Sequence, residues 1–243
     1  MSTGQLPLAM RWPQQQRFDS YLAGDNAVAV ELLRRAATHA GSDWVFVGGP
    51  GASGKSHLLI AACAAASEAG RSAQYVSLRR SRSASDVATG LDASARAISA
   101  LGGSDLLALD DIDAIAGDRE AAIALFDLFN RCKVENSTML FAAAAAPAQI
   151  GIALPDLVSR LASCAQAQLR PLADAERREV VRARAQARGI VLDDDALAWL
   201  FTHTQRDLGS LTRLLERIDN ASLAAKRRVT VPFLRVLVAD KSP

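Results

Sequence analysis

The chain of 243 residues is long enough for one large domain, or for a core with a smaller appended domain. Half of the residues are apolar, so a sizeable core can form, and only 5% are aromatic, which favours closely packed helices over a β-sandwich. The formal net charge of +2 predicts no strong overall attraction to nucleic acid or to an anionic membrane.

The three cysteines, Cys63, Cys132 and Cys164, lie far apart and show no paired spacing typical of metal ligands. Cys63 stands in an apolar helical run, which indicates a core thiol. The first sixteen residues lack a signal-peptide pattern, and no apolar run is long enough to cross a bilayer. We therefore expect a cytoplasmic protein with reduced thiols.

Residues 1–16 contain two prolines and four glutamines with little periodicity, which predicts a flexible tail. Short apolar runs then alternate with helical patterns. Strands are expected at 44–47, 74–78, 106–109 and 138–143, and helices at 55–69 and 118–135. Strands that alternate with helices predict a parallel sheet covered on both faces.

After Pro171 only helical patterns follow. The expected helices span roughly 173–188, 193–204, 207–226 and 231–239, and Asp193 and Thr230 are candidate N-caps. The change in pattern places a boundary near Arg170. The predicted organisation is a tail over 1–16, an αβα core over 17–170 and a small helical domain over 171–243.

The loop after the first strand fits the phosphate-binding pattern G-x-x-x-x-G-K-[ST] without a mismatch. Its glycines let backbone N–H groups converge on phosphate oxygens, and the next helix adds its positive amino end. Lys55 is expected on the outer phosphates and Ser56 on Mg²⁺. A glycine-rich turn without a ligand is the alternative, which the flanking strand and helix argue against. The expected nucleotide contacts are Gly49, Pro50, Gly51, Ala52, Ser53, Gly54, Lys55, Ser56 and His57.

The strand at 106–109 ends in two carboxylates, Asp110 and Asp111. In nucleotide hydrolases the first acid at such a strand end holds Mg²⁺, and we expect Asp110 in that role. Asp111 is then the candidate for polarising an attacking water. Taken alone, the pair is better explained as a strand followed by an Asp turn. An intact phosphate loop upstream favours the functional interpretation.

With these elements in place, the chain resembles the AAA+ core of the bacterial replication initiator DnaA, and more closely the Hda family of short DnaA homologues. The resemblance runs from about residue 5 to the C-terminus. The matching stretches are 18–26 (FDSYLAGDN), 54–59 (GKSHLL), 115–118 (IAGD), 126–131 (FDLFNR), 154–161 (LPDLVSRL) and 229–233 (VTVPF).

Further site residues are implied by this resemblance. Arg160 matches the family's arginine finger, which reaches into a neighbouring subunit's nucleotide site, and Arg206 matches the sensor-2 arginine of the lid. A solvated surface charge is the alternative for each. The tail resembles a peptide that docks on the β sliding clamp through Gln5, Leu6, Leu8 and Met10, with simple disorder as the alternative.

Two departures from the family pattern bear on function. The chain stops at Pro243 after the lid helices, so we expect no helix-turn-helix reader of origin DNA, and the cluster Lys226 to Arg228 is too small to replace one. Where the family places a polar sensor-1 side chain, this chain has five alanines, Ala142 to Ala146. Alanine orients no water, so weak or no intrinsic hydrolysis is expected.

The resemblance implies an α/β fold: an AAA+ P-loop αβα sandwich with a helical lid. It also implies ADP or ATP with Mg²⁺ as cofactors, and the clamp and DnaA as partners, with DNA reached only through the clamp. The implied function is to stimulate ATP hydrolysis by DnaA and so repress re-initiation of chromosome replication. Self-association into a homodimer stays open, as do two other functions, an AAA+ ATPase that loads a helicase and a small-molecule kinase.

Overall fold

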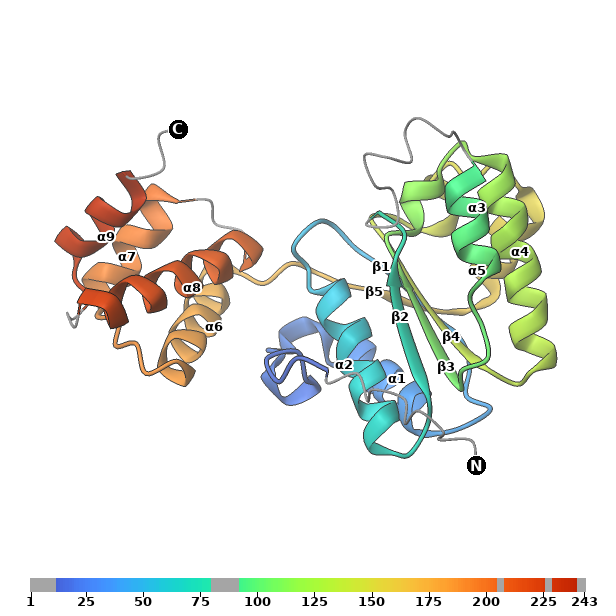
Figure 1. The fold of residues 1–243 in the computed structure, drawn as a ribbon, viewed down its shortest axis with the longest axis horizontal. Helices are drawn as coiled ribbons and strands as arrows, with labels where there is room; N and C mark the ends of the chain where they lie inside the picture. The colour runs from blue at the N-terminus through green and yellow to red at the C-terminus, as the bar shows by residue number, and fades with distance from the viewer. Residues whose placement is uncertain (1–11, 80–91, 205–207, 226–228, 240–243) are drawn as a thin grey trace, which may run out of the picture. The chain divides into compact units, whose positions relative to one another are not determined.

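The computed structural model describes residues 12–79, 92–204, 208–225 and 229–239. The chain divides into two compact units between Pro171 and Leu172. The first unit is a sheet between helices, and the second is a bundle of helices (Figure 1).

The sheet of the first unit has five parallel strands in the order β2-β3-β4-β1-β5. The strands are β1 (Val45–Gly48), β2 (Ala73–Ser77), β3 (Leu106–Asp110), β4 (Thr138–Ala143) and β5 (Ala165–Gln168). Every residue of β1, β3 and β4 is buried. Such continuous apolar runs are typical of parallel strands that helices cover on both faces.

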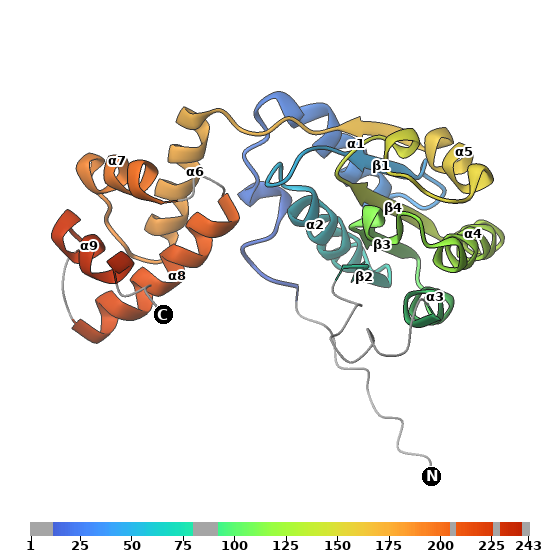
Figure 2. The same ribbon diagram turned by 90° about the horizontal axis from the view of Figure 1, so that it is seen from above.

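Helices cover the two faces in separate layers (Figures 1 and 2). Helices α1 (Ala27–Thr38) and α2 (Lys55–Glu68) lie on one face, and α3 (Asp92–Ser99), α4 (Arg119–Val134) and α5 (Pro155–Ser163) lie on the other. Alternate strand side chains enter the two cores: Val47 and Ala108 join the first layer, whereas Phe46 and Phe141 join the second. The sandwich architecture expected from the sequence is confirmed.

The second unit contains four helices in its described residues: α6 (Asp174–Ala187), α7 (Asp194–His203), α8 (Leu208–Ala225) and α9 (Val231–Ala239). Their apolar faces meet in one core that includes Leu200, Ile218 and Leu234. Asp193 caps α7 by accepting a hydrogen bond from the Ala196 N–H at 2.7 Å, as expected. Short 3-10 turns occur in the first unit at η1 (Phe18–Ser20), η2 (Gly24–Asn26), η4 (Ile112–Ile115) and η5 (Pro147–Gln149).

The sequence patterns missed β5, α1, α3 and α5. Strand β5 reads Ala-Gln-Ala-Gln and only Ala167 is buried, so it carries no apolar run. The structured core also begins earlier than the expected end of the tail at residue 16, because the Trp12 indole N–H donates to Ser67 Oγ at 2.9 Å on α2. None of the helices in the described ranges combines the length and apolar composition of a membrane crossing.

Candidate functional site

The carboxyl ends of the strands gather most of the predicted site residues at one edge of the sheet. The parallel register pairs Ser77 with Asp110, Leu109 with Phe141, and Gly48 with Ala143. The phosphate loop after β1 and the acids after β3 therefore flank the end of β4. This is the edge where open parallel sheets bind their ligands.

The phosphate loop runs from Gly49 to Gly54, between β1 and α2. Gly54, directly before α2, is left-handed with φ of 95°, and Ala52 also has a positive φ of 60°. A left-handed alanine is uncommon and costs backbone energy, and such residues cluster at ligand sites. Gly51 is exposed, and an added Cβ there would meet no atom within 4 Å.

The segment before α1 braces this loop, which the sequence patterns did not reveal. The Tyr21 hydroxyl donates to the Ser53 carbonyl at 3.1 Å, and a Cβ on Gly54 would lie 2.5 Å from the Tyr21 ring. Asn26 in turn donates to the Tyr21 hydroxyl and to the Arg170 carbonyl. Burial raises the pKa of Tyr21, so its hydroxyl stays a donor. The family stretch 18–26 thus has a structural role beside the loop.

His57, expected among the nucleotide contacts, turns its ring toward the segment before α1. Its ring is buried, and Nε2 is 2.9 Å from the Arg17 carbonyl and 3.5 Å from Ser20 Oγ. The ring also packs beside Tyr21, with centroids 5.4 Å apart. The His57 ring therefore helps to hold the bracing segment, and the role of His57 as a nucleotide contact stays a prediction.

Lys55 bends back over the loop. Its ammonium donates to the carbonyls of Gly49 at 2.7 Å and Pro50 at 2.8 Å. Burial lowers the pKa of Lys55, and the nearby carboxylates of Asp110, Asp113 and Asp111 oppose that shift. The lysine and the three acids therefore share one electrostatic neighbourhood, as a site for phosphates and Mg²⁺ requires.

Asp110 and Asp111 lie side by side at the end of β3 but have different partners. Asp110 is 1% exposed, and it accepts hydrogen bonds from the Tyr75 hydroxyl at 2.8 Å and from the Asp111 N–H at 2.9 Å. Asp111 takes a left-handed conformation with φ of 58° and accepts from Ser77 Oγ at 2.7 Å. The side chain proposed to act on water is thus already bonded within the chain.

A third acid, Asp113, was not singled out from the sequence. One of its oxygens accepts from the Ala144 N–H at 3.1 Å, and the other pairs with Arg79 at 2.8 Å. Ala144 belongs to the run Ala142 to Ala146, where the family resemblance led us to expect a polar side chain. A carboxylate of η4 therefore holds the backbone just after β4.

Magnesium fits this site as an ion that arrives with the nucleotide. Within the described ranges, no three or more His, Cys, Asp or Glu side chains group as metal ligands. Mg²⁺ needs no such cage, because it keeps several waters and binds through one or two carboxylates plus substrate phosphates. Asp110, which already accepts hydrogen bonds from the Tyr75 hydroxyl and the Asp111 N–H, and the exposed Ser56 at the start of α2 are the groups that would hold the ion.

Arg160 stands apart from this edge, in the last turn of α5. Its half-buried guanidinium lies over the Phe126 ring at 4.6 Å and the Phe129 ring at 5.4 Å. It forms no ion pair with a carboxylate of the described residues. The predicted Gln5, Leu6, Leu8, Met10 and Arg206 lie outside the described residues.

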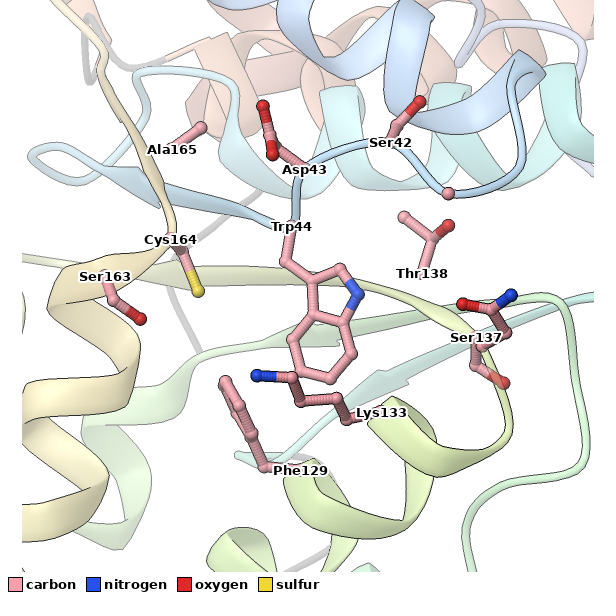
Figure 3. A pocket seen from close by; sticks show the side chains of 12 residues that line it. Ser42, Asp43, Trp44, Phe129, Lys133, Ser137, Thr138, Ser163, Cys164 and Ala165 are labelled. Carbon is pink, nitrogen blue, oxygen red and sulfur yellow. The ribbon is translucent and has the colours of Figure 1, made fainter.

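A cavity of about 540 Å³ opens at the opposite, amino-terminal edge of the sheet (Figure 3). The Trp44 indole projects into it and meets the Phe129 ring edge to face, with centroids 4.4 Å apart. Asp43 and Lys133 stand exposed at its rim. None of the predicted site residues lines this cavity, so it is distinct from the phosphate loop.

Residues 13–168 match the family model of the bacterial DnaA ATPase domain, and residues 174–238 match that of the Hda lid domain. The chain belongs to the DnaA-homologous AAA+ family, and it is of the Hda type. The family resemblance in the sequence is thereby confirmed. The helical unit is the lid of this AAA+ protein.

Solved structures show the same AAA+ fold. Domain III of the Thermotoga maritima replication initiation protein DnaA aligns with a TM-score of 0.77 at 18% identity, covering 95% of this chain and 98% of that one. The replication initiator DnaA bound to AMPPCP and single-stranded DNA aligns with a TM-score of 0.65 at 21% identity, covering 88% of this chain and 69% of that one. Thermotoga maritima RuvB T158V aligns with a TM-score of 0.61 at 16% identity, covering 89% of this chain and 68% of that one.

Proposed function

We propose that this Hda-type protein binds ADP or ATP with Mg²⁺ and, docked on the β sliding clamp, stimulates ATP hydrolysis by DnaA. The initiator would then pass into its ADP form and re-initiation would be repressed. The observation that carries the proposal is an intact phosphate loop in a chain that matches both the DnaA ATPase domain and the Hda lid. The DnaA structures that bind AMPPCP give the nucleotide a precedent in the same fold.

The loop would hold the phosphates with backbone amides and with Lys55. Lys55 has to leave the Gly49 and Pro50 carbonyls and turn toward the phosphates, which is favourable because a charged acceptor makes a stronger hydrogen bond than a carbonyl. Mg²⁺ would supply charge neutralisation between the phosphate oxygens. Ser56 and Asp110 would orient the Mg²⁺. The contact of Arg206, the expected sensor-2 arginine of the lid, with the nucleotide stays a prediction.

Weak hydrolysis by the chain itself follows from two features. The alanines after β4 offer no polar side chain toward a terminal phosphate or a water. Asp111, the remaining candidate for polarising water, is bonded to Ser77. A bound nucleotide is then retained and acts as a structural ligand.

Arg160 suits a role in trans. A cation held over aromatic rings is stabilised by about 0.5–1 kcal/mol at an exposed site and by about 2 kcal/mol when it is desolvated. The half-buried guanidinium of Arg160 therefore gives up at most a few kcal/mol when it leaves the two rings for a phosphate. An arginine supplied by a partner accelerates phosphoryl transfer by about 10³ to 10⁵, because it neutralises charge that grows in the transition state. One side chain is therefore sufficient for the proposed stimulation.

The decisive experiment measures ATP hydrolysis by DnaA in the presence of clamp-loaded DNA and this protein. Arg160→Ala should reduce the stimulation by about 10³ while nucleotide binding and clamp retention stay unchanged. Arg35→Ala, which removes an exposed arginine of α1, is the matched control and should stimulate normally. Stimulation by Arg160→Ala equal to wild type would refute the assignment.

The tail is proposed as the clamp-docking element. A strand-like peptide can place Leu8 and Met10 in an apolar pocket while Gln5 bonds at the rim. Changing these three residues to Ala should abolish retention on immobilised clamp without altering nucleotide binding. Unchanged retention would reject the tail as the docking element.

A helicase-loading ATPase is the competing function in the same family. It would need turnover by the chain itself. Robust hydrolysis by the purified protein, increased by single-stranded DNA and without DnaA, would favour the loader over the regulator.

A further inference from the structure

Arg79, directly after β2, bridges two carboxylates of the candidate nucleotide site. Its guanidinium lies 2.8 Å from an Asp113 oxygen and 3.7 Å from an Asp111 oxygen. The two acids follow β3, the neighbour of β2 in the sheet, so the bridge joins adjacent strand ends. Arg79 was not among the residues that the sequence patterns singled out.

The bridge places a positive charge beside several negative charges at this edge. Asp110, Asp111 and Asp113 stand together, and their side chains are mostly buried, with 27% of Asp111 and 22% of Asp113 exposed. Buried carboxylates need a counter-charge, and a polyphosphate brought beside them adds more negative charge. Lys55 alone cannot offset three carboxylates and a polyphosphate.

Electrostatics places Arg79 in the same neighbourhood as the phosphate-binding lysine. The negative charges of all three acids raise the pKa of Lys55, and the positive charge of Arg79 lowers it. The planar fork of an arginine suits such a bridge, because it can meet two carboxylates at once. The Arg79 side chain is 65% exposed, and each acid that it meets has a second partner: Asp111 accepts from the Ser77 hydroxyl and Asp113 from the Ala144 N–H.

We propose that Arg79 is a positioning residue of the nucleotide site, supplying from within the chain the positive charge that lets Asp111 and Asp113 stand beside a bound polyphosphate. The inference rests on the proposed nucleotide binding. In most such sites Mg²⁺ provides this neutralisation. With Arg79 in place, nucleotide binding depends less on Mg²⁺, and without Arg79 the acids need the metal.

The test compares nucleotide affinity with and without metal. The dissociation constant of a fluorescent ADP analogue is measured in excess Mg²⁺ and in EDTA. The readout is the dissociation constant in EDTA divided by the dissociation constant in Mg²⁺. In Arg79→Gln the ratio should rise about tenfold over wild type, a change of about 1.4 kcal/mol. Most of the change should appear in EDTA, because Mg²⁺ replaces the missing charge.

Three further variants distinguish the charge from a structural role. Arg79→Lys keeps the charge without the fork and should stay within about threefold of the wild-type ratio. Arg79→Gln combined with Asp113→Asn removes one charge of each sign and should restore the wild-type ratio. Arg35→Gln, at an exposed position of α1, is the surface control and should leave the ratio unchanged.

The possible outcomes separate this inference from the function on which it rests. An Arg79→Gln ratio equal to that of wild type, or a double variant that does not recover, would overturn the role of Arg79 alone. Wild-type protein that binds no nucleotide in either buffer would overturn the proposed nucleotide site as well.

Discussion

Two arginines flank strand β2, and they serve the molecule in different ways. Arg71, before the strand, is surrounded by oxygens of the protein itself: the carbonyls of Ala36, Ala37 and Asp105 and the hydroxyl of Thr138, all within 3.0 Å. Arg79, after the strand, meets carboxylates beside the phosphate loop.

The difference follows from the direction of parallel strands and their helices. Helix α1 ends near the amino edge of the sheet and leaves carbonyls without helical partners, and Arg71 satisfies two of them. At the carboxyl edge, loop amides and acids are left for a ligand. Arg71, whose hydrogen bonds all go to carbonyl and hydroxyl oxygens of the fold, stabilises the folded state. Arg79, which offsets the charge of acids beside the ligand site, affects the affinity for the ligand.

Of the effects on the two edges of the sheet, the largest that we expect is on stability at the amino edge. Arg71→Met should lower the free energy of unfolding by about 3 kcal/mol, because it leaves several acceptors without a donor. Nucleotide affinity of the remaining folded protein should be unchanged. Urea unfolding combined with a nucleotide titration checks both parts, and a stable Arg71→Met protein with weakened nucleotide binding would reverse the comparison.

The next effect belongs to the carboxyl edge. Lys55→Ala should weaken ADP binding about 100-fold, because a charge-assisted contact to phosphate is lost, and it should hardly move the urea midpoint. Lys133→Ala, at the rim of the amino-edge cavity, is the matched control and should bind ADP as wild type does. Equal losses in both variants would mean that the loop is not the binding site.

Gly54 couples loop conformation to stability. Gly54→Ala puts a Cβ on a residue with φ of 95° and within 2.5 Å of Tyr21, so it should cost about 2 kcal/mol of stability and also weaken ADP binding. Gly51→Ala has open space and should change the free energy of unfolding little. Thermal unfolding with and without ADP measures both, and equal behaviour of the two variants would count against the bracing of the loop by Tyr21.

The smallest effect concerns Asp105 at the amino edge. The Ser72 hydroxyl and N–H hold the pKa of Asp105 below its usual 3.8. A lowered pKa stabilises the fold above 3.8, and this contribution is lost as the pH falls through the folded-state value. Asp105→Asn should therefore be slightly less stable than wild type at pH 7 and equal to it near pH 2. If the difference in unfolding free energy between Asp105→Asn and wild type persisted near pH 2, the ionised carboxylate would be excluded as its cause.

Sequence patterns predicted the loop, the acids after β3 and most strands, because each rests on local chemistry or on continuous apolar runs. Strand β5 escaped, since its place is fixed by pairing with β1 and not by its own composition. Tyr21, Asn26 and Arg79 also escaped. Their roles depend on contacts with residues far along the chain, such as Arg170 and Asp113, and no periodicity encodes these.

The most direct test of the account is the nucleotide content of the purified protein, measured by acid release and chromatography after incubation with Mg²⁺ and ADP. We expect close to one ADP or ATP per chain in the wild-type protein and almost none in Lys55→Ala. Wild-type protein without nucleotide, or equal amounts in the two proteins, would contradict the phosphate site on which the proposed regulation of DnaA depends.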